Sequence, residues 1–395
     1  MNVLDLLLIV AALGFAVTGY RQGFVVGVLS VLGFLGGGLI AVQLLPLLLR
    51  HLDPGTVASV VAVLVVIVFA AIGQAVTTHF GWKLRGHIGR RPARTLDAVG
   101  GSVVNVISML LVAWLIGSAL AGTSMPTVSK QVRSSQVLGG VQATLPASAP
   151  NWFRDFTQAL ARNGFPQVFN PFEREQITEV SPPDPALAAS PAVTRARQSL
   201  VKVVGTATAC GKTLEGTGFV FAPHRVMTNA HVVGGVDEPT VQVGGTGKLY
   251  DATVVRYDWQ RDIAVLDVPK LDAPALEFVA DEAKSNDSAI VAGFPENGAF
   301  NVQPARIRGR IKATGSDIYH RGQVVRDIYS IRSLVRQGNS GGPLLSPEGK
   351  VFGVVFAKSL DSSDTGYVLT AAEVQGEAAA GAAATGRVDT EGCAL

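Results

Sequence analysis

One short segment toward the end of the chain combines a nucleophilic side chain with glycines at fixed offsets. Residues 338–344 read GNSGGPL, so glycines stand two residues before and one residue after Ser340. Such glycines allow a sharp turn that aims backbone N–H groups at a substrate carbonyl. The segment therefore predicts acyl transfer, with Ser340 as the nucleophile and the amides of Gly338 and Ser340 as an oxyanion hole.

This nucleophile needs a general base, and the base needs a group that orients it. The sequence TNAHVV contains His231, although a lone histidine among small and β-branched residues is more typical of a buried core position. The sequence RDIAVL places Asp262 at the entry of an apolar strand, where an orienting carboxylate belongs. For that reason we prefer Asp262 to its neighbours Asp258 and Asp267.

The scaffold that must bring these residues together is predicted to be all-β. From Ser199 onward, short β-branched runs alternate with Gly, Asn, Asp and Pro, and only the extreme tail is typical of helix. Regular short strands with turn punctuation favour a barrel or a sandwich. The runs include 200–204, 218–221, 240–243, 252–255, 263–268, 289–292, 324–331 and 351–356.

These segments, in the chain order His231, Asp262, Ser340, resemble chymotrypsin-fold serine peptidases and most closely the HtrA/DegP-like branch. The likeness spans roughly residues 199–370 and also includes the sequences GTGFV and DIAVL, with no cysteine after the histidine. It implies a chymotrypsin-like double β-barrel in which His231 is general base and acid, Asp262 its orienter and Ser340 the nucleophile. It implies no cofactor and no metal.

Phe356 and the tail depart from the family pattern, and Leu334 bears on specificity. Phe356 stands where relatives often have a small hydroxyl residue near the aspartate, so the hydrogen bonds of that aspartate are expected to differ. Leu334, six residues before Ser340, would lie near the base of the specificity pocket and would favour an apolar or small P1 residue. The Ala/Gly-rich stretch after Thr370 is too short and too poor in apolar residues for a PDZ domain, so PDZ recognition of substrate termini is not expected.

The N-terminal part of the chain has a different character. The mean hydropathy is +0.34, and residues 1–49 contain a single arginine and a single aspartate. Four apolar stretches are long enough to cross a bilayer and predict a four-helix transmembrane domain. No Lys or Arg precedes the first stretch, so we interpret it as a retained span rather than a signal peptide. The stretches are Leu4–Gly19, Phe24–Leu49, Val57–Thr78 and Gly101–Leu120.

Small and polar residues inside these stretches predict how the helices pack. Glycines recur four residues apart, at positions 19, 23 and 27 and again at 33 and 37, which places them on one helix face and allows close approach. The isolated amides of Gln43, Gln74 and Asn105 are expected to form hydrogen bonds between helices.

Charge in the loops predicts the orientation of the spans. Between the third and fourth spans a single Asp97 stands against five basic residues, and such basic loops stay on the cytoplasmic side. Both termini are then expected outside the cytoplasm, which makes the peptidase domain extracytoplasmic (periplasmic). The basic residues are Lys83, Arg85, Arg90, Arg91 and Arg94.

The membrane part resembles the colicin V production (CvpA) type of domain in its hydropathy and its many small residues. Its combination with the peptidase domain resembles the membrane-anchored acid-resistance serine proteases of actinobacteria, the MarP-like family. That likeness implies a role in envelope stress or acid resistance.

We divide the chain into a transmembrane domain (1–121), a connector (122–192) and a trypsin-like serine peptidase domain (193–395). In the connector, Asn151–Leu160 carries aromatic residues at helical spacing, which predicts a short amphipathic helix. Ser181–Pro191 contains four prolines and little to bury, so we interpret it as a tether.

The two cysteines, Cys210 and Cys393, have neither metal-site nor C-x-x-C redox spacing. They are either two inert thiols or one disulfide. An extracytoplasmic location would let a disulfide persist. The bridge would pin an otherwise loose tail to the first strands of the barrel.

Together these features predict a membrane-anchored serine endopeptidase that hydrolyses extracytoplasmic proteins. Its partners would be protein or peptide substrates and the lipid bilayer, since a net charge of +3 is too small to indicate nucleic-acid binding. The alternative is a catalytically silent extracytoplasmic binding scaffold on a CvpA-like domain. A transporter regulated by the peptidase is disfavoured, because ionisable residues are scarce inside the spans.

Overall fold

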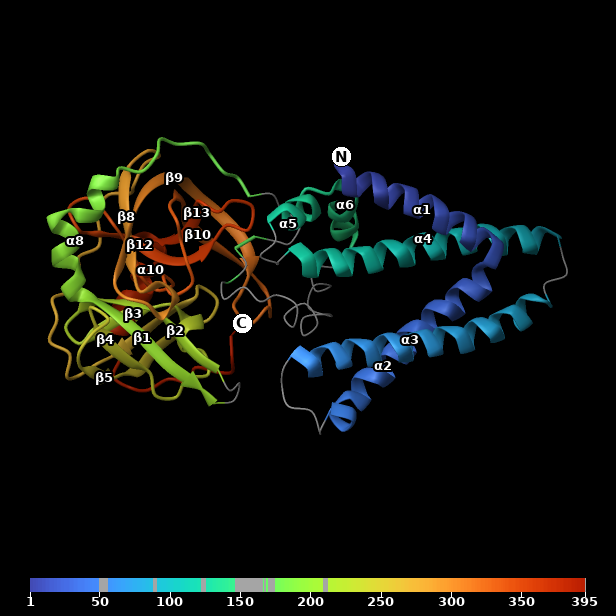
Figure 1. The fold of residues 1–395 in the computed structure, drawn as a ribbon, viewed down its shortest axis with the longest axis horizontal. Coiled ribbons are helices and arrows are strands. Elements are labelled where there is room, and N and C mark those ends of the chain that lie inside the picture. The colour runs from blue at the N-terminus through green and yellow to red at the C-terminus, as the bar shows by residue number, and fades with distance from the viewer. Residues whose placement is uncertain are drawn as a thin grey trace. The chain divides into compact units, whose positions relative to one another are not determined.

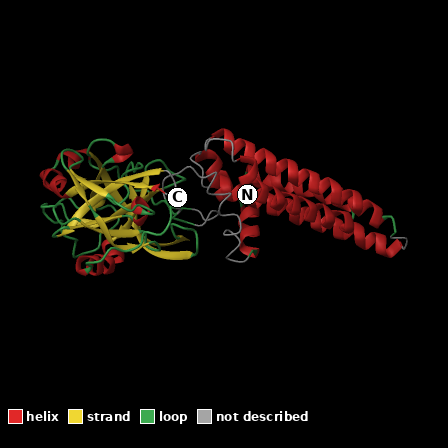
Figure 2. Ribbon diagram, turned by 90° about the horizontal axis from the view of Figure 1, so that it is seen from below, coloured by secondary structure: helices red, strands yellow, loops and turns green. Residues whose placement is uncertain are grey.

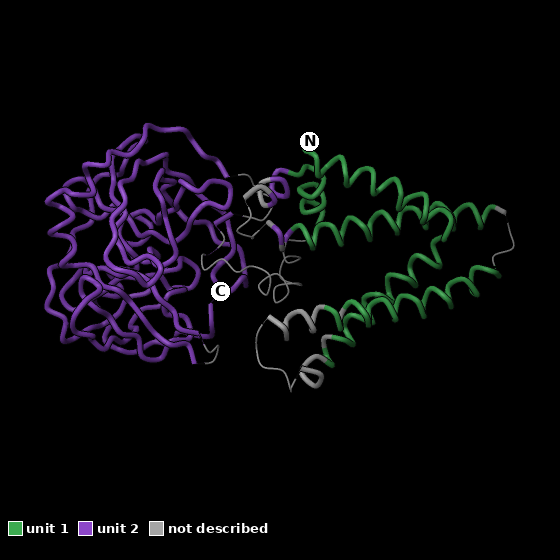
Figure 3. Tube along the Cα trace, in the orientation of Figure 1, with its two compact units in different colours: residues 1–117, 135–145 green, residues 118–134, 146–395 purple. Residues whose placement is uncertain are grey.

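The computed structural model describes residues 1–49, 56–87, 91–121, 126–145, 166, 168–169, 175–208 and 212–394. The chain divides into two compact units (Figure 3). Unit 1 comprises residues 1–117 and 135–145, and unit 2 comprises residues 118–134 and 146–395. In the described residues, helices make up unit 1, and the strands all lie in unit 2 (Figures 1 and 2). The helix predicted over Asn151–Leu160 lies outside the described residues.

In the part of unit 1 that the structure describes, there are four long helices and one short one. Three stretches of these described residues are long and apolar enough to cross a membrane: Val3–Gln22, Phe24–Ala41 and Pro92–Ser118. They make this a membrane protein. The third predicted span, Val57–Thr78, falls in α3, where some side chains lie outside the described residues. The helices are α1 (Val3–Gln22), α2 (Phe24–Leu49), α3 (Thr56–Arg85), α4 (Arg91–Ala121) and α6 (Gln136–Thr144).

Helix α4 begins ten residues before the predicted span, so much of the predicted basic loop is helical. Asp97 on α4 pairs with Arg85 on α3 at 2.7 Å and accepts a hydrogen bond from the amide of Val25 at 3.1 Å. The two charges are partly buried, and each satisfies the other. One carboxylate therefore ties three helices together at this end of unit 1.

The predicted glycine contacts are present between α2 and α3. A Cβ atom on Gly33 would lie only 2.3 Å from the carbonyl oxygen of Gly73, so only glycine permits this approach. The amide of Gln74 donates to the hydroxyl of Ser30 at 2.9 Å, which confirms the predicted hydrogen bond between helices. Asn105 instead donates to Gly101 of its own helix, and Gln43 is exposed.

Helix α6 is fixed to unit 1 by a buried carboxylate. Asp5, in the first turn of α1, accepts hydrogen bonds from the Ser135 hydroxyl at 2.6 Å and from the Val137 amide at 3.1 Å. It thus satisfies N–H groups at the start of α6 that have no partner within the helix. At the other end, the Trp114 indole donates to Gln142 at 2.6 Å. Residues beyond position 121 therefore form part of the helical unit.

The first half of unit 2 is a seven-stranded antiparallel sheet of order β5-β4-β1-β2-β3-β7-β6. Its two end strands, β5 and β6, are separated in sequence by Ala252 alone, so the sheet must curl back until its ends meet. The strands are β1 (Leu200–Ala207), β2 (Lys212–Ala222), β3 (Arg225–Thr228), β4 (Thr240–Val243), β5 (Leu249–Asp251), β6 (Thr253–Asp258) and β7 (Ile263–Asp267).

The second half is a closed barrel of order β10-β13-β12-β11-β8-β9. The predicted all-β architecture is thus found as two sheets, of which the second alone closes by strand pairing within the described residues. The strands are β8 (Ser288–Gly293), β9 (Asn301–Ser316), β10 (Gln323–Arg332), β11 (Pro343–Leu345), β12 (Val351–Lys358) and β13 (Thr365–Thr370). Short helices are α5 (Pro126–Arg133), η2 (Pro185–Ala189), α8 (Pro191–Ala196), η3 (Arg197–Ser199), α9 (Ala230–Val233) and η5 (Pro295–Asn297).

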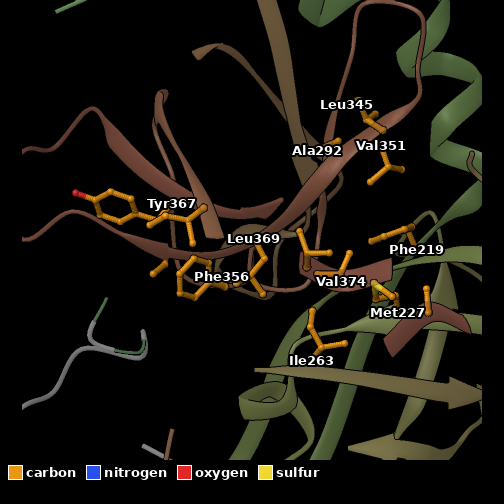
Figure 4. Packing of buried hydrophobic residues seen from close by; sticks show 14 of the residues in the cluster. Phe219, Met227, Ile263, Ala292, Leu345, Val351, Phe356, Tyr367, Leu369 and Val374 are labelled. Atoms are coloured by element: carbon orange, nitrogen blue, oxygen red, sulfur yellow. The ribbon is translucent and has the colours of Figure 1, made fainter. Parts of the chain in front are cut away.

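One hydrophobic cluster joins the two sheets (Figure 4). It includes Met227 and Ile263 from the first sheet, Phe356 and Leu369 from the barrel, and Val374 from α10 (Ala371–Ala383). Each of these side chains is fully buried. Burying such a side chain contributes about 1.5–3 kcal/mol, so the two sheets form a single folding unit.

The C-terminal tail is held in place, which corrects the expectation of a loose tail. Thr370 caps α10 by accepting from the Glu373 amide at 3.1 Å, and α10 packs on both sheets. Beyond the helix, the Tyr319 hydroxyl donates to the carbonyls of Thr390 and Gly392 at 3.1 and 2.9 Å. Long-range hydrogen bonds therefore fix the tail independently of any cysteine.

A strap, residues 175–184, lies along the barrel. Three arginines on β9 and β10 donate to three of its backbone carbonyls, two residues apart. The start of the predicted tether is therefore bound to the barrel, because an extended chain offers every second carbonyl to the same side. The pairs are Arg308 with Thr178 (2.7 Å), Arg332 with Val180 (2.8 Å) and Arg306 with Pro182 (3.1 Å).

Glu175, the first residue of the strap, anchors it to unit 2. Its buried carboxylate accepts hydrogen bonds from the Leu360 amide at 3.1 Å, from the Tyr367 hydroxyl at 2.8 Å and from the Ser359 hydroxyl. Arg133 of α5 lies 3.6 Å from the same carboxylate. This cluster ties the strap and α5 to the loop between β12 and β13.

Candidate active site

His231 is presented by a one-turn helix. Strand β3 ends at Thr228, and α9 follows at once with His231 as its second residue. The ring is 6% exposed, so it is buried apart from one edge. The histidine thus lies at the end of a core strand, close to the surface of the unit.

Asp262 meets His231 through two hydrogen bonds. One carboxylate oxygen accepts from the ring Nδ1 at 2.7 Å, and the other accepts from the backbone N–H of His231 at 2.9 Å. This double contact fixes the ring orientation and places the proton on Nδ1, which leaves Nε2 as an acceptor.

The backbone of Asp262 adopts a left-handed conformation with φ of 64°. Such a conformation is uncommon for a residue other than glycine and persists only where neighbours over-determine it. Asn229 supplies one such contact, since its amide donates to the Asp262 carbonyl at 2.7 Å. Of the alternatives, Asp258 accepts from the amides of its own turn, and Asp267 pairs with Arg225.

A buried arginine supports the same turn from the barrel. Arg326 on β10 is 2% exposed, and its guanidinium donates to the Gln260 carbonyl at 2.6 and 3.0 Å and to the Ser316 carbonyl at 3.1 and 3.2 Å. Burial lowers the pKa of Arg326, while the charges of Asp262 and Asp317 oppose that shift. A single arginine in a β-strand carried no sequence signal for this role.

Ser340 lies in the turn between β10 and β11, beside the His231 segment. A Cβ atom on its neighbour Gly341 would lie 2.9 Å from the Asn229 amide nitrogen, so the two segments are in direct contact. The Ser340 side chain is buried, and its hydroxyl has no hydrogen-bond partner in the described structure. The segments that carry His231 and Ser340 are therefore in contact, but the imidazole and the hydroxyl are not hydrogen-bonded.

The backbone of this turn fixes the direction of two amides. The Gln337 carbonyl accepts from the Glu296 amide at 2.8 Å, and the Asn339 carbonyl accepts from the Gly342 amide at 3.0 Å. In a trans peptide the N–H points opposite to the C=O. The next amides along the chain, those of Gly338 and Ser340, consequently point the other way, and neither has an acceptor among the described residues.

Gly338 can adopt this conformation because it lacks a side chain. Its φ is +90°, and a Cβ atom would lie 2.5 Å from the Phe294 carbonyl oxygen. The glycine two residues before the serine is thus required by both backbone angle and space.

The remaining residues singled out in the sequence are placed as follows. Phe356 is fully buried in the core cluster, so no hydroxyl reaches Asp262 from that position. Leu334 is 48% exposed in the loop after β10. Cys393 lies in the tail after α10, whereas Cys210 lies outside the described residues. Across the described ranges, no group of three or more His, Cys, Asp or Glu side chains could hold a metal.

The fold and these contacts define a trypsin-like serine peptidase joined to a helical membrane domain. Residues 216–354 match the family model of the trypsin-like peptidase domain. Residues 4–146 match that of the colicin V production protein, a range that includes α6. The chain is therefore a serine protease, as the sequence motifs predicted.

More specifically, the chain belongs to the family of the serine protease Rv3671c of Mycobacterium tuberculosis, the MarP-like family. It is 39% identical to that protein over 382 residues, which cover 95% of both chains. The crystal structure of the active form of the Rv3671c protease superposes with a TM-score of 0.55 at 47% identity, covering 58% of this chain and 100% of that chain. A probable periplasmic DegP-like serine endoprotease of Chlamydia pneumoniae is 35% identical over 160 residues, covering 39% of this chain and 30% of that protein.

Proposed function

We propose that this chain is a membrane-anchored endopeptidase that cleaves proteins outside the cytoplasm with the triad His231, Asp262 and Ser340. The observation that carries the proposal is the double hydrogen bond between Asp262 and His231, at 2.7 and 2.9 Å. It holds the imidazole with Nε2 available as a base, next to the segment that carries a buried serine hydroxyl.

In this mechanism the Ser340 hydroxyl rotates toward Nε2 of His231 when substrate binds. The oxygen attacks the substrate carbonyl carbon, and its proton passes to Nε2. The imidazolium, stabilised by Asp262, then gives that proton to the leaving nitrogen, and the peptide C–N bond breaks. A water molecule activated by the same imidazole hydrolyses the acyl-enzyme and frees Ser340.

The amides of Gly338 and Ser340 would bind the oxyanion that forms during this attack. They are held by neighbouring hydrogen bonds before substrate arrives, so they need no reorganisation at the moment of reaction. Losing one such donor typically costs about 10²–10³ in kcat.

We further infer that four helices span the membrane and that the peptidase unit faces the outside. The basic residues near the α3–α4 junction favour the cytoplasmic side for that end. An even number of spans then returns both termini to the outside. Alkaline phosphatase fused after Ser124 is expected to be active, and an inactive fusion would contradict this orientation.

Outside the cytoplasm, a disulfide between Cys210 and Cys393 would persist. Finding both cysteines alkylated in the native, unreduced protein would contradict it. A role in envelope stress or acid resistance follows from the family likeness and is part of the same proposal.

The triad is tested by labelling the full chain in detergent with a fluorophosphonate probe. Wild type is expected to be labelled, and Ser340→Ala to lose both labelling and peptidase activity. Ser316→Ala is the control, because it removes a hydroxyl at the end of β9 in the same unit and keeps the carbonyl that Arg326 binds. Equal labelling of wild type and Ser340→Ala would rule out Ser340 as the nucleophile, and no labelling of either protein would support the silent scaffold.

A further inference from the structure

Thr217 on β2 uses all of its polar groups in hydrogen bonds, and two of them reach the serine turn. Its amide donates to the Ser340 carbonyl at 2.8 Å, and its hydroxyl donates to the Gly338 carbonyl at 2.7 Å. The hydroxyl also accepts from the Phe294 amide at 3.0 Å, and the Thr217 carbonyl accepts from Thr228 at 2.8 Å. The residue is fully buried.

With these contacts, every backbone carbonyl of the serine turn, residues 337–340, accepts a hydrogen bond. Four successive carbonyls, from Gln337 to Ser340, are each bound to a donor: Glu296, Thr217, Gly342 and Thr217 again. Each carbonyl fixes the plane of its peptide, and with it the direction of the next N–H. Thr217 therefore sets two of the four peptide planes around the nucleophile.

The space around Thr217 is fitted to this side chain. A Cβ atom on Gly341 would lie 2.1 Å from the Thr217 carbonyl oxygen, and one on Gly293 would lie 2.6 Å from the Thr217 hydroxyl. One on Gly342 would lie 3.1 Å from its methyl group. Two of these glycines belong to the serine motif, so part of that motif makes room for the threonine.

Thr217 also connects the serine turn to the turn that precedes η5. Its hydroxyl holds the Phe294 amide, and two residues later the Glu296 amide holds the Gln337 carbonyl. The one hydroxyl thus contacts both the Gly338 carbonyl and the segment whose Glu296 amide orients the preceding peptide.

We propose that Thr217 is a positioning residue that preorganises the oxyanion hole by holding the carbonyls of Gly338 and Ser340. The inference rests on the proposed function of Ser340 as nucleophile. Thr217 touches no substrate; it fixes the 338–339 and 340–341 peptides, and these limit rotation of the adjacent peptides whose amides, those of Gly338 and Ser340, would bind the oxyanion. Loss of its hydroxyl should therefore weaken binding of the transition state more than binding of the substrate.

The test compares Thr217→Val, which removes the hydroxyl at nearly constant volume, with Thr217→Ser, which keeps it. With p-nitrophenyl acetate as substrate, the valine variant is expected to lose about 10- to 100-fold in kcat with KM changed less than about twofold. The serine variant is expected to stay within about threefold of wild type. Thr213→Val, the same change at an exposed position of β2, is the matched control.

Two further measurements separate positioning from general damage. Phenylboronic acid forms a tetrahedral adduct with the serine, so its inhibition constant should rise in Thr217→Val by the same factor as kcat falls. The shape of the pH–rate profile should not change, because the contact between His231 and Asp262 is untouched. If the valine variant does not fold, as judged by thermal unfolding, Thr217→Ala replaces it against Thr217→Ser.

Unchanged kcat in the hydroxyl-free variant, or a loss that serine does not rescue, would overturn the proposal. A boronate affinity that stays at the wild-type value despite a lower kcat would overturn it as well. Failure of the proposed function is distinguishable, since it requires that Ser340→Ala retain activity, whatever Thr217 does.

Discussion

His231 and Asp262 come from the seven-stranded sheet, whereas Ser340 comes from the closed barrel, and the two sheets hold their residues by different means. On the first sheet, a carboxylate binds the imidazole directly, at 2.7 Å. On the barrel, hydrogen bonds fix the main chain around the serine, but its hydroxyl has no partner in the described structure.

In the proposed mechanism, the two sides therefore control separate steps. The histidine side sets which nitrogen carries a proton, so damage there should change the protonation behaviour of the enzyme. The serine side sets where two amides point, so damage there should weaken binding of the oxyanion. Variants on the two sides should therefore be separable by their kinetics.

The largest effect after removal of the nucleophile is expected for Asp262→Asn. An amide cannot accept both hydrogen bonds from His231, and it favours the wrong tautomer, so kcat should fall by about 10⁴-fold, as for the same change in the chymotrypsin triad. Steady-state kinetics checks this, with Asp258→Asn as the matched control at a nearby turn. A loss below about 10-fold would remove Asp262 from the triad.

Arg326→Met tests whether the barrel also supports the histidine side. It leaves the Gln260 and Ser316 carbonyls without their buried donor, at about 1–3 kcal/mol each. We expect the free energy of unfolding to fall by about 2–4 kcal/mol and kcat to fall with it, because the turn before Asp262 relaxes. Arg310→Met, a partly exposed arginine on the neighbouring strand, is the control for denaturant unfolding and kinetics. Equal effects of both variants would contradict a specific role for Arg326.

A smaller effect is expected where the strap begins. Glu175→Gln removes the charge that Arg133 faces and weakens three hydrogen bonds, so the free energy of unfolding should fall by about 1–3 kcal/mol. Differential scanning calorimetry of unit 2 within the full chain would measure it. Glu179→Gln, at an 87% exposed side chain of the same strap, should leave the unfolding temperature unchanged, and equal shifts would show that the anchor is not specific.

The smallest effect concerns acid stability. The Ser362 hydroxyl, followed by Arg308 and Arg332, lowers the pKa of Asp364. A lowered pKa in the folded state means that the contribution to stability is present above the unfolded pKa of about 3.9 and is lost as the pH falls below it. Because Asp364 is 48% exposed, the contribution should stay below about 1 kcal/mol.

Asp364→Asn removes the pH-dependent contribution of this carboxylate to stability. Its unfolding temperature should therefore drop less than that of wild type between pH 5 and 3, in matched thermal unfolding series. Parallel pH curves for the two proteins would show that Asp364 does not contribute.

The sequence predicted those features whose chemistry is encoded in short runs. The turn around Ser340, the strand entry at Asp262 and most strands depend on neighbours a few residues away. The roles of Arg326 and of the Thr217 hydroxyl were not predictable. Arg326 binds a carbonyl 66 residues away in the sequence, and Thr217 binds one 121 residues away. The helix after Thr370 also has a local signal, since T-x-x-E is a capping pattern before an alanine-rich run.

The membrane part followed the same rule. Hydropathy located the helices, and glycine spacing located their contacts. The capping of α6 by Asp5 was missed, because the two are 130 residues apart and a lone aspartate in a first span indicates no particular partner.

The strap along the barrel is recognised through its main chain, since Arg308, Arg332 and Arg306 bind carbonyl oxygens. These hydrogen bonds do not depend on which side chains the strap carries at those positions. The strap can therefore accumulate substitutions at the exposed positions 178 and 182 as long as it remains extended, while each of the three arginines is individually constrained. Two related chains could thus differ at these positions and still dock the strap in the same way, provided that the buried Val180 and the Glu175 carboxylate are kept.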